Sequence, residues 1–208
     1  MATTVASRPS SEVDSEHSVR PRRFTQEEYF RMVEVGILDA DDRTELLDGH
    51  IVEMVAQNAP HRAVIVEANK HFVTALQGTG YSVQVQSTLP LDDDNVPEPD
   101  IAVFRGSGAD LLEGEPDEIP LIVEVADSSL EKDRTTKLRC YAANGIPEYW
   151  IVNLQNDTIE VYREPAEGEY RRRETMAAGD DIVPRFHEAL SFEVTDLLPG
   201  RDSGSDQR

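Results

Sequence analysis

One segment constrains the fold of this chain of 208 residues more than any other. The run Ile-Pro-Leu-Ile-Val-Glu-Val-Ala-Asp at 119–127 is apolar at nearly every position, which predicts a strand buried on both faces in the middle of a sheet. A helical segment follows directly at 128–145 and ends at Gly145. Ser128 and Glu131 have the spacing of a capping box at its start. A buried strand that runs into a helix indicates an α/β fold.

The other segments complete a mixed sheet. They predict a helix that starts at Thr25 and ends at Gly36, and a second from Pro60 to Gly78. They also predict a hairpin at 44–54 around Asp48-Gly49, and strands at 81–89, 100–104, 148–154, 158–164 and about 169–174. We therefore predict a mixed β-sheet flanked by helices, with an N-terminal helix and hairpin. Residues 1–20 and 199–208 are polar and are expected to be disordered tails, which leaves one domain at 21–198.

Charge and composition limit the partners and the location. The net charge is −21, and because the two tails are nearly neutral, the domain carries −20. This argues against a simple basic groove for nucleic acid. A local basic strip would have to use Arg134, Arg139 and the run at 171–173. The sequence has neither a membrane-spanning apolar segment nor a secretory h-region, and its single cysteine, Cys140, fits a reducing cytoplasm.

Two carboxylates at predicted strands define the candidate site. Asp100 heads one strand in Val-Pro-Glu-Pro-Asp-Ile, and Glu124 lies inside the apolar run of the next. A buried lone carboxylate is costly unless a cation or several donors meet it. If the two strands are neighbours, both carboxylates reach one point, and hard oxygen ligands at that point suit Mg²⁺ or Mn²⁺.

Two further residues join this prediction. Lys137 lies two turns into the helix after the Glu124 strand, and this helix should pack back on the sheet. An amine near the carboxylates can position or deprotonate a metal-bound water and offset charge on a phosphate. Glu45, in the first hairpin, interrupts an apolar pattern and is the fourth candidate.

Five motifs follow one another along the chain: Thr-Glu-Leu-Leu-Asp-Gly-His-Ile-Val-Glu-Met at 44–54, Pro99-Asp100, Val-Glu-Val-Ala-Asp-Ser-Ser at 123–129, Asp133-x-x-x-Lys137-x-x-x-Tyr141, and Gly-Ile-Pro-Glu-Tyr-Trp-Ile-Val at 145–152. In this order they resemble the Uma2 family, from about residue 24 to 198. That family is placed among the restriction-endonuclease-like PD-(D/E)XK nucleases. The resemblance implies a restriction-endonuclease-like core and cleavage of a phosphodiester with a divalent metal.

The resemblance also implies roles for individual residues. Asp100 and Glu124 match the two acids that bind Mg²⁺, and Glu45 matches an early Glu that often joins the site. The motif's lysine, two positions after the second acid, is here Ala126. The resemblance implies that Lys137 on the helix supplies the amine instead.

Each residue also has a structural interpretation that the sequence leaves open. Asp100 can cap a strand, and Glu124 can form a structural ion pair. Lys137 can face solvent beside Asp133, and Glu45 can lie on an exposed face of the hairpin.

Neighbouring polar residues have similar alternatives. Ser128 and Ser129 are interpreted as helix caps rather than nucleophiles, because no histidine is placed as their base. His61 starts the second helix, where a capping or surface role competes with an approach to the site.

Two function classes remain. The first is a Mg²⁺- or Mn²⁺-dependent nuclease that acts on nucleic acid, with DNA expected, and a homodimer is possible. The second is a catalytically silent binding module that keeps the fold, favoured by Ala126 and by the acidic charge. Hydrolysis of another phosphoester would use the same site.

Overall fold

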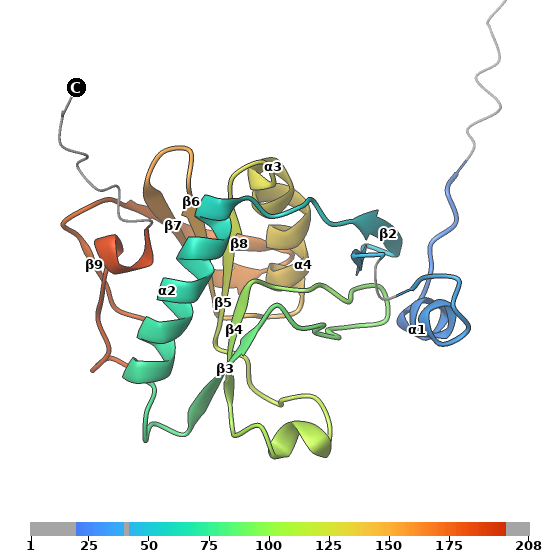
Figure 1. Cartoon of the computed structure of the whole chain (residues 1–208), viewed down its shortest axis with the longest axis horizontal. Coiled ribbons are helices and arrows are strands. Elements are labelled where there is room, and N and C mark those ends of the chain that lie inside the picture. The colour runs from blue at the N-terminus through green and yellow to red at the C-terminus, as the bar shows by residue number, and fades with distance from the viewer. Residues whose placement is uncertain (1–19, 40–41, 199–208) are drawn as a thin grey trace, which may run out of the picture.

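The computed structural model describes residues 20–39 and 42–198, in which helices cover both faces of one six-stranded sheet (Figure 1). The helices are α1 (Gln26–Glu34), α2 (Ala59–Ala75), α3 (Leu130–Lys132) and α4 (Leu138–Ala143), with a π-helical turn at Asp133–Lys137 and 3₁₀ turns at Asp110–Leu112 and Val194–Leu197. The strands are β1 (Thr44–Leu47), β2 (His50–Glu53), β3 (Tyr81–Val85), β4 (Ile101–Arg105), β5 (Leu121–Ala126), β6 (Glu148–Asn153), β7 (Thr158–Ala166), β8 (Glu169–Met176), β9 (Asp181–Ile182) and β10 (Phe192–Glu193). The predicted tails lie outside the described residues, except for Arg20.

The main sheet has the order β3-β4-β5-β6-β7-β8. Neighbours run antiparallel except β5 and β6, which are parallel. A parallel pair needs a crossover, and the segment from α3 to α4 provides it. All six residues of β5 are buried, as the apolar run predicted for a central strand. The predicted mixed α/β fold is confirmed.

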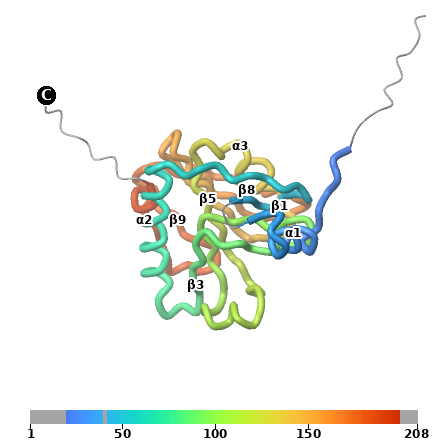
Figure 2. Tube along the Cα trace, turned by 45° about the vertical axis from the view of Figure 1, so that its right-hand side comes forward, coloured from blue at the N-terminus to red at the C-terminus, as the bar shows by residue number. Residues whose placement is uncertain are grey.

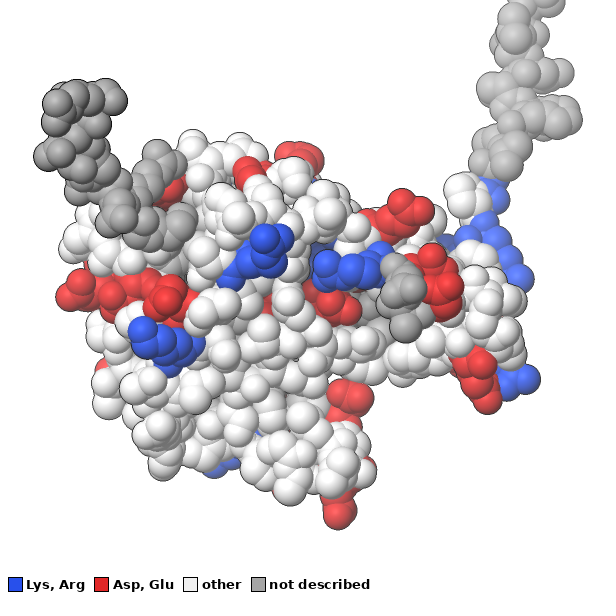
Figure 3. All heavy atoms as spheres, in the orientation of Figure 1, with Lys and Arg blue, Asp and Glu red and all other residues white. Residues whose placement is uncertain are grey.

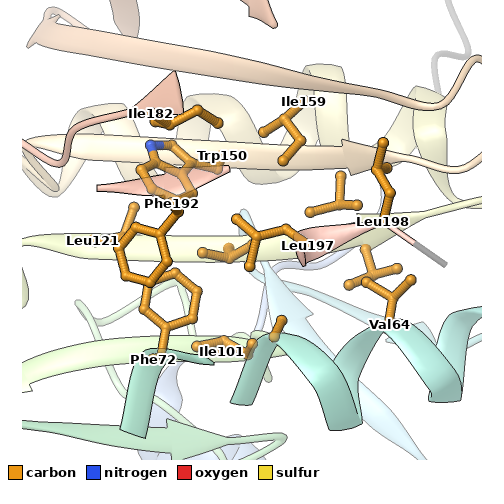
Figure 4. Close-up of a cluster of buried hydrophobic side chains, with 14 of the residues drawn as sticks. Val64, Phe72, Ile101, Leu121, Trp150, Ile159, Ile182, Phe192, Leu197 and Leu198 are labelled. Carbon is orange, nitrogen blue, oxygen red and sulfur yellow. The ribbon is translucent and has the colours of Figure 1, made fainter. Parts of the chain in front are cut away.

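One face of the sheet packs against α2. The side chains of Val123 and Val125 lie on this face and join the larger core cluster. Phe72 of α2 contacts Phe192 of β10, with ring centroids 4.6 Å apart, and both rings lie near Trp150 (Figure 4). Trp150 is fully buried, as its place in an apolar strand predicts.

The opposite face packs against α3 and α4, which lie across the sheet from α2 in Figure 1; Figure 2 shows α3 in the same place. Ile122 and Ala126 of β5 point to this face and join a second cluster with Cys140 and Tyr141 of α4. Because side chains alternate along a strand, Glu124 between them also points toward these helices. The one charged residue of β5 is therefore aimed at the crossover segment.

The crossover differs from its prediction. The sequence pattern predicts one α-helix over 128–145, but residues 133–137 form a π-helical turn. The predicted cap at Ser128 is wrong: the residue before the first helical position is Ser129, and its hydroxyl donates to the Asp133 carboxylate at 2.6 Å instead of capping the helix. π-helical turns are frequent at functional sites.

The N-terminal helix and hairpin form as predicted. Thr25 and Glu28 make both bonds of a capping box at the start of α1. β1 and β2 pair around Asp48 and Gly49, which both have positive φ, at 49° and 71°. The hairpin lies beyond the α4 side of the sheet (Figure 1), and its residue Glu45 contacts lysines of the crossover segment. The short strands β9 and β10 were not predicted.

The turn at Gly49 allows a test of hairpin placement. A Cβ at Gly49 would meet the Arg23 side chain at 2.8 Å, whereas Gly78, with a similar φ of 75°, has open space around it. We expect Gly78→Ala to lower the free energy of unfolding by about 1 kcal/mol from backbone strain, and Gly49→Ala by about 2 kcal/mol or more. Urea denaturation measures both variants, and equal losses would contradict the steric contribution.

Candidate active site

Asp100 and Glu124 lie side by side on adjacent strands. Antiparallel pairing of Ile101 with Val123 places Asp100, just before β4, next to Glu124 in β5. Both are buried, with 6% and 3% of their surface exposed. The backbone N–H of Val125 donates to Asp100 Oδ2 at 2.8 Å, which fixes the carboxylate at the start of β4.

Lys137 comes from the π-helical turn and meets Glu124 directly. Its Nζ lies 2.7 Å from Glu124 Oε1 and 2.7 Å from Glu45 Oε1, and it is 2% exposed. The alternative of a solvent-facing lysine is therefore wrong. The Tyr141 hydroxyl also donates to Glu124 Oε1, at 2.6 Å. Both contacts reach the same oxygen of Glu124.

Glu45 is fully buried, so the alternative of an exposed hairpin residue is wrong as well. Its Oε1 accepts from the backbone N–H of Glu98 at 2.9 Å, and its Oε2 accepts from Lys132 Nζ at 2.9 Å. Glu45 thus holds two lysines of the crossover segment. It reaches Lys137 rather than either predicted metal ligand by a direct contact.

His61 belongs to the site. Asn58 caps α2 and its side chain accepts from the backbone N–H of His61, the third residue of the helix. His61 Nε2 lies 3.2 Å from Asp100 Oδ2, while Nδ1 is buried without a hydrogen-bond partner in the part of the chain that the structure describes. Gln86 Nε2 donates to Asp100 Oδ1 at 3.1 Å. The capping and surface interpretation of this histidine is wrong.

Asp133 and Lys132 were not predicted as site residues. Asp133 is 2% exposed and lines the same cavity as Lys137, with Ser129 bound to its carboxylate. The sequence does contain a signal for it. Ser129 and Asp133 are four residues apart in the segment after the central strand, a spacing that places them on one helix face.

These residues surround a small cavity. It measures about 50 Å³ and is lined by the acids Glu98, Asp100, Glu124, Asp127 and Asp133, by the cations Lys132 and Lys137, by His61, and by the segment 54–58 with Val125, Ser128 and Ser129. A cavity needs roughly 10–15 Å³ to hold one water. The space beside Asp100, Glu124 and Lys137 therefore admits a few waters or an ion.

Burial sets the charges of the cluster. It raises the pKa of Glu124 to about 8; Lys137 opposes this rise, and the nearby carboxylates Asp100, Asp133 and Glu45 reinforce it. Burial also raises the pKa of Asp133, although Lys137 and Ser129 oppose the rise. Both pKa values are raised in part because the cluster holds more carboxyl groups than lysines.

The other groups hold their charges. Burial opposes ionisation of Asp100, but the bond and charge of His61 and the Val125 N–H lower its pKa overall. The same holds for Glu45, where Lys137 and Lys132 outweigh burial. For Lys137, burial favours loss of the proton, but Glu124 and Glu45 outweigh it and raise the pKa.

The donor set fits a hard divalent cation. Asp100 and Glu124 offer carboxylate oxygens to the cavity, and the surplus of negative charge favours a dication. Among residues 20–39 and 42–198, no group of three or more His, Cys, Asp or Glu side chains is arranged to hold a metal ion. Mg²⁺ is commonly bound by one or two carboxylates and completes its shell with water and substrate phosphate, so two protein ligands suffice.

The arginines proposed for a basic strip are mostly neutralised. Arg134 Nε and Arg173 Nη2 both donate to Glu160, at 3.1 and 2.9 Å. Arg172 pairs with Glu174 at 2.9 Å, and Arg139 pairs with Asp48. This set therefore does not form the basic strip. Across the described segments, no helix has the length and apolar character to cross a membrane.

The chain belongs to the Uma2 family, described as "Putative restriction endonuclease", whose sequence model matches residues 26–195. The membership predicted from the motifs is confirmed. None of the curated proteins that were compared matches the chain.

Two solved structures are similar. One is a "putative nuclease belonging to DUF820" from Anabaena variabilis, with a TM-score of 0.67 and 17% identity over 84% of this chain and 97% of the other. This likeness supports the fold. The other is the type IIG restriction endonuclease BpuSI, with a TM-score of 0.34 and 16% identity over 53% of this chain and 12% of that one, a match too weak to support an argument.

The contact of Lys137 with Glu45 and Glu124 predicts how the variant Lys137→Met changes stability. Lys137→Met removes the buried cation from Glu45 and a hydrogen-bond donor from Glu124, and we expect a loss of about 3 kcal/mol in the free energy of unfolding. Lys132→Met removes a partly exposed lysine from Glu45 alone and should cost about 1 kcal/mol. Urea denaturation at neutral pH compares the two, and a similar small loss in both would contradict a central role for Lys137.

Proposed function

We propose that this protein is a divalent-metal-dependent endonuclease that hydrolyses phosphodiester bonds of DNA. The supporting observation is that Asp100, Glu124 and Lys137, from two strands and a helix, meet at one cavity. The family description agrees with a nuclease. In the reaction, water adds its oxygen to phosphorus, one ester P–O bond breaks, and the water's proton ends on the leaving oxygen.

Asp100 and Glu124 are the proposed ligands of Mg²⁺ or Mn²⁺. When bound, the cation would supply positive charge for the phosphate and acidify a water. The Asp100 carboxylate is already oriented before an ion binds, because Val125, Gln86 and His61 contact its two oxygens. In Glu124, Lys137 and Tyr141 hold Oε1, and Oε2 is the oxygen that we assign to the ion.

Lys137 is proposed to orient the attacking water and to stabilise charge on the phosphate. The raised pKa of its ammonium keeps the proton on Nζ at neutral pH. A protonated amine donates hydrogen bonds but does not accept a proton. We therefore assign it positioning and electrostatic stabilisation rather than deprotonation, with Glu45 holding the ammonium in place.

A second candidate is a binding module without catalysis. The observation that favours it is the ion pairing itself: Lys137 satisfies Glu45 and Glu124 without any ion, so the cluster also works as a structural network. Ala126 at the usual lysine position agrees with this candidate. Metal binding and cleavage separate the two functions.

Metal titration tests the site without a substrate. Calorimetry with Mg²⁺ or Mn²⁺ should show saturable binding to the wild type and none to the double variant Asp100→Ala, Glu124→Ala. Glu174→Gln, an acid on β8 paired with arginines, serves as control and should bind normally. A wild type that binds neither metal would favour the binding module.

The raised pKa of Glu124 predicts how metal affinity varies with pH. Below about pH 8 Glu124 holds a proton that a cation must displace, so affinity should rise with pH and level off above about 8. One displaced proton corresponds to roughly tenfold in affinity per pH unit. Mn²⁺ titration from about pH 6 to about pH 9 measures this, and an affinity that is flat over that range would contradict the assignment of Glu124 as a ligand.

Cleavage tests the role of Lys137. We expect Lys137→Met, under conditions where circular dichroism shows it folded, to cut DNA about 100-fold or more slowly than wild type while it still binds metal. Lys70→Met, a change at an exposed lysine of α2 that pairs with Glu67, serves as the control and should keep most of the activity. Equal rates for wild type and Lys137→Met would remove Lys137 from the mechanism.

A further inference from the structure

Most cations of this acidic chain are already paired with acids. Among the described residues, the Lys and Arg side chains that have no carboxylate within 4.0 Å are Arg20, Arg62 and Arg171. Phosphate binding depends on cations that can release counterions, and a cation already neutralised by an acid contributes less. These three arginines are therefore the candidates for a contact with a substrate phosphate, and their distance from the candidate active site distinguishes them.

Arg62 is the one of these three next to the candidate active site. It follows His61, whose Nε2 lies 3.2 Å from Asp100 Oδ2, in the first turn of α2. Its Nη1 donates to the Gln57 carbonyl at 2.8 Å, which holds the guanidinium against the segment before the helix. A guanidinium has five N–H donors, so this single bond leaves others to bind a ligand.

Arg62 lines a second cavity that shares a wall with the first. This cavity measures about 720 Å³, and Met54, Ala56 and Gln57 line both. Arg43 also lines it, and its Nη2 donates to Glu98 of the first cavity at 3.4 Å. The first cavity suits a water or an ion, whereas the second has room for part of a nucleotide.

The charge of the second cavity differs from that of the whole chain. Arg43 and Arg62 are balanced there by Asp42 and Glu53, so the cavity is locally neutral in a protein of net charge −21. Figure 3 shows Lys and Arg side chains on this face over the first turns of α2 and near the β1–β2 hairpin, with acidic patches around them. A phosphate in the second cavity therefore meets two cations and two acids rather than an excess of acids.

We propose that Arg62 binds the DNA backbone phosphate next to the bond that the acid cluster cleaves. The inference rests on the proposed function, because it places this phosphate relative to Asp100 and Glu124. Arg62 is a substrate-binding residue in this proposal and takes no part in the bond-breaking step. Its guanidinium suits two phosphate oxygens at once.

The test compares two arginines of equal charge. Arg62→Gln removes the charge and keeps an amide that can still donate to Gln57, and Arg171→Gln removes the charge of an exposed arginine on β8 that has no acid partner. Binding of a short fluorescent DNA duplex is followed by anisotropy in Ca²⁺, in which cleavage is not required, at several salt concentrations. Thermal unfolding verifies that both variants are folded.

We expect Arg62→Gln to weaken DNA binding about tenfold at low salt and to reduce the salt slope by about one phosphate contact, with Arg171→Gln near wild type. Equal effects of the two variants, no effect of Arg62→Gln, or a wild type that binds no DNA would each overturn the proposal. RNA of the same sequence bound more tightly than DNA would overturn the choice of DNA.

Cleavage in Mn²⁺, measured separately, distinguishes this inference from the proposed function. If Arg62→Gln loses DNA binding but the wild type does not cleave DNA, the phosphate contact is supported and the proposed nuclease function is rejected. If the wild type cleaves DNA but Arg62→Gln binds it as well as the wild type does, the nuclease function is supported and the phosphate contact is rejected.

Discussion

The contact of one ammonium with two buried carboxylates is what the centre of this structure depends on. Lys137 lies 2.7 Å from both Glu45 and Glu124, and these acids come from a hairpin and from the central strand. Without the ammonium, Glu45 would keep only the partly exposed Lys132 as its cation, and Glu124 would lose a hydrogen-bond donor to its buried Oε1. The same contact therefore joins three parts of the chain that are distant in sequence. It also keeps Asp100 and Glu124 at a cavity, because the crossover helix cannot move away from β5 without separating the charges.

Much of the fold could be predicted from the sequence, because local patterns encode it. The alternation of β3, the apolar run of β5, the Asp48-Gly49 turn and the capping box at Thr25 each specify a local structure, and all are present. β9 and β10 were missed because strands of two residues have no periodicity to detect. The cap at Ser128 failed because Ser129 bonds to Asp133 instead.

The site was predictable in part. Glu124 was detectable because a carboxylate in an apolar strand requires a partner, and Glu45 because it interrupts a hydrophobic pattern. His61 could not be placed, because its contact with Asp100 depends on how α2 packs across the sheet, and no local pattern records that packing. Asp133 looked like the exposed partner of Lys137. The π-helical turn, which the sequence did not indicate, buries both residues.

The π-helical turn has a consequence for how such proteins can be recognised. A π turn accommodates one residue more than an α turn, and each residue of an α-helix advances about 100° around the axis. If residues 133–137 formed an α turn instead, Lys137 would lie at a different angle around the helix axis relative to Ser129, and its amine would no longer face Glu124. The position of the amine is set by the angle of Lys137 around the helix axis. It is not set by a fixed spacing between the lysine and Glu124 in the sequence. Searches that require an acid and a lysine two positions apart would pass over chains built in this way.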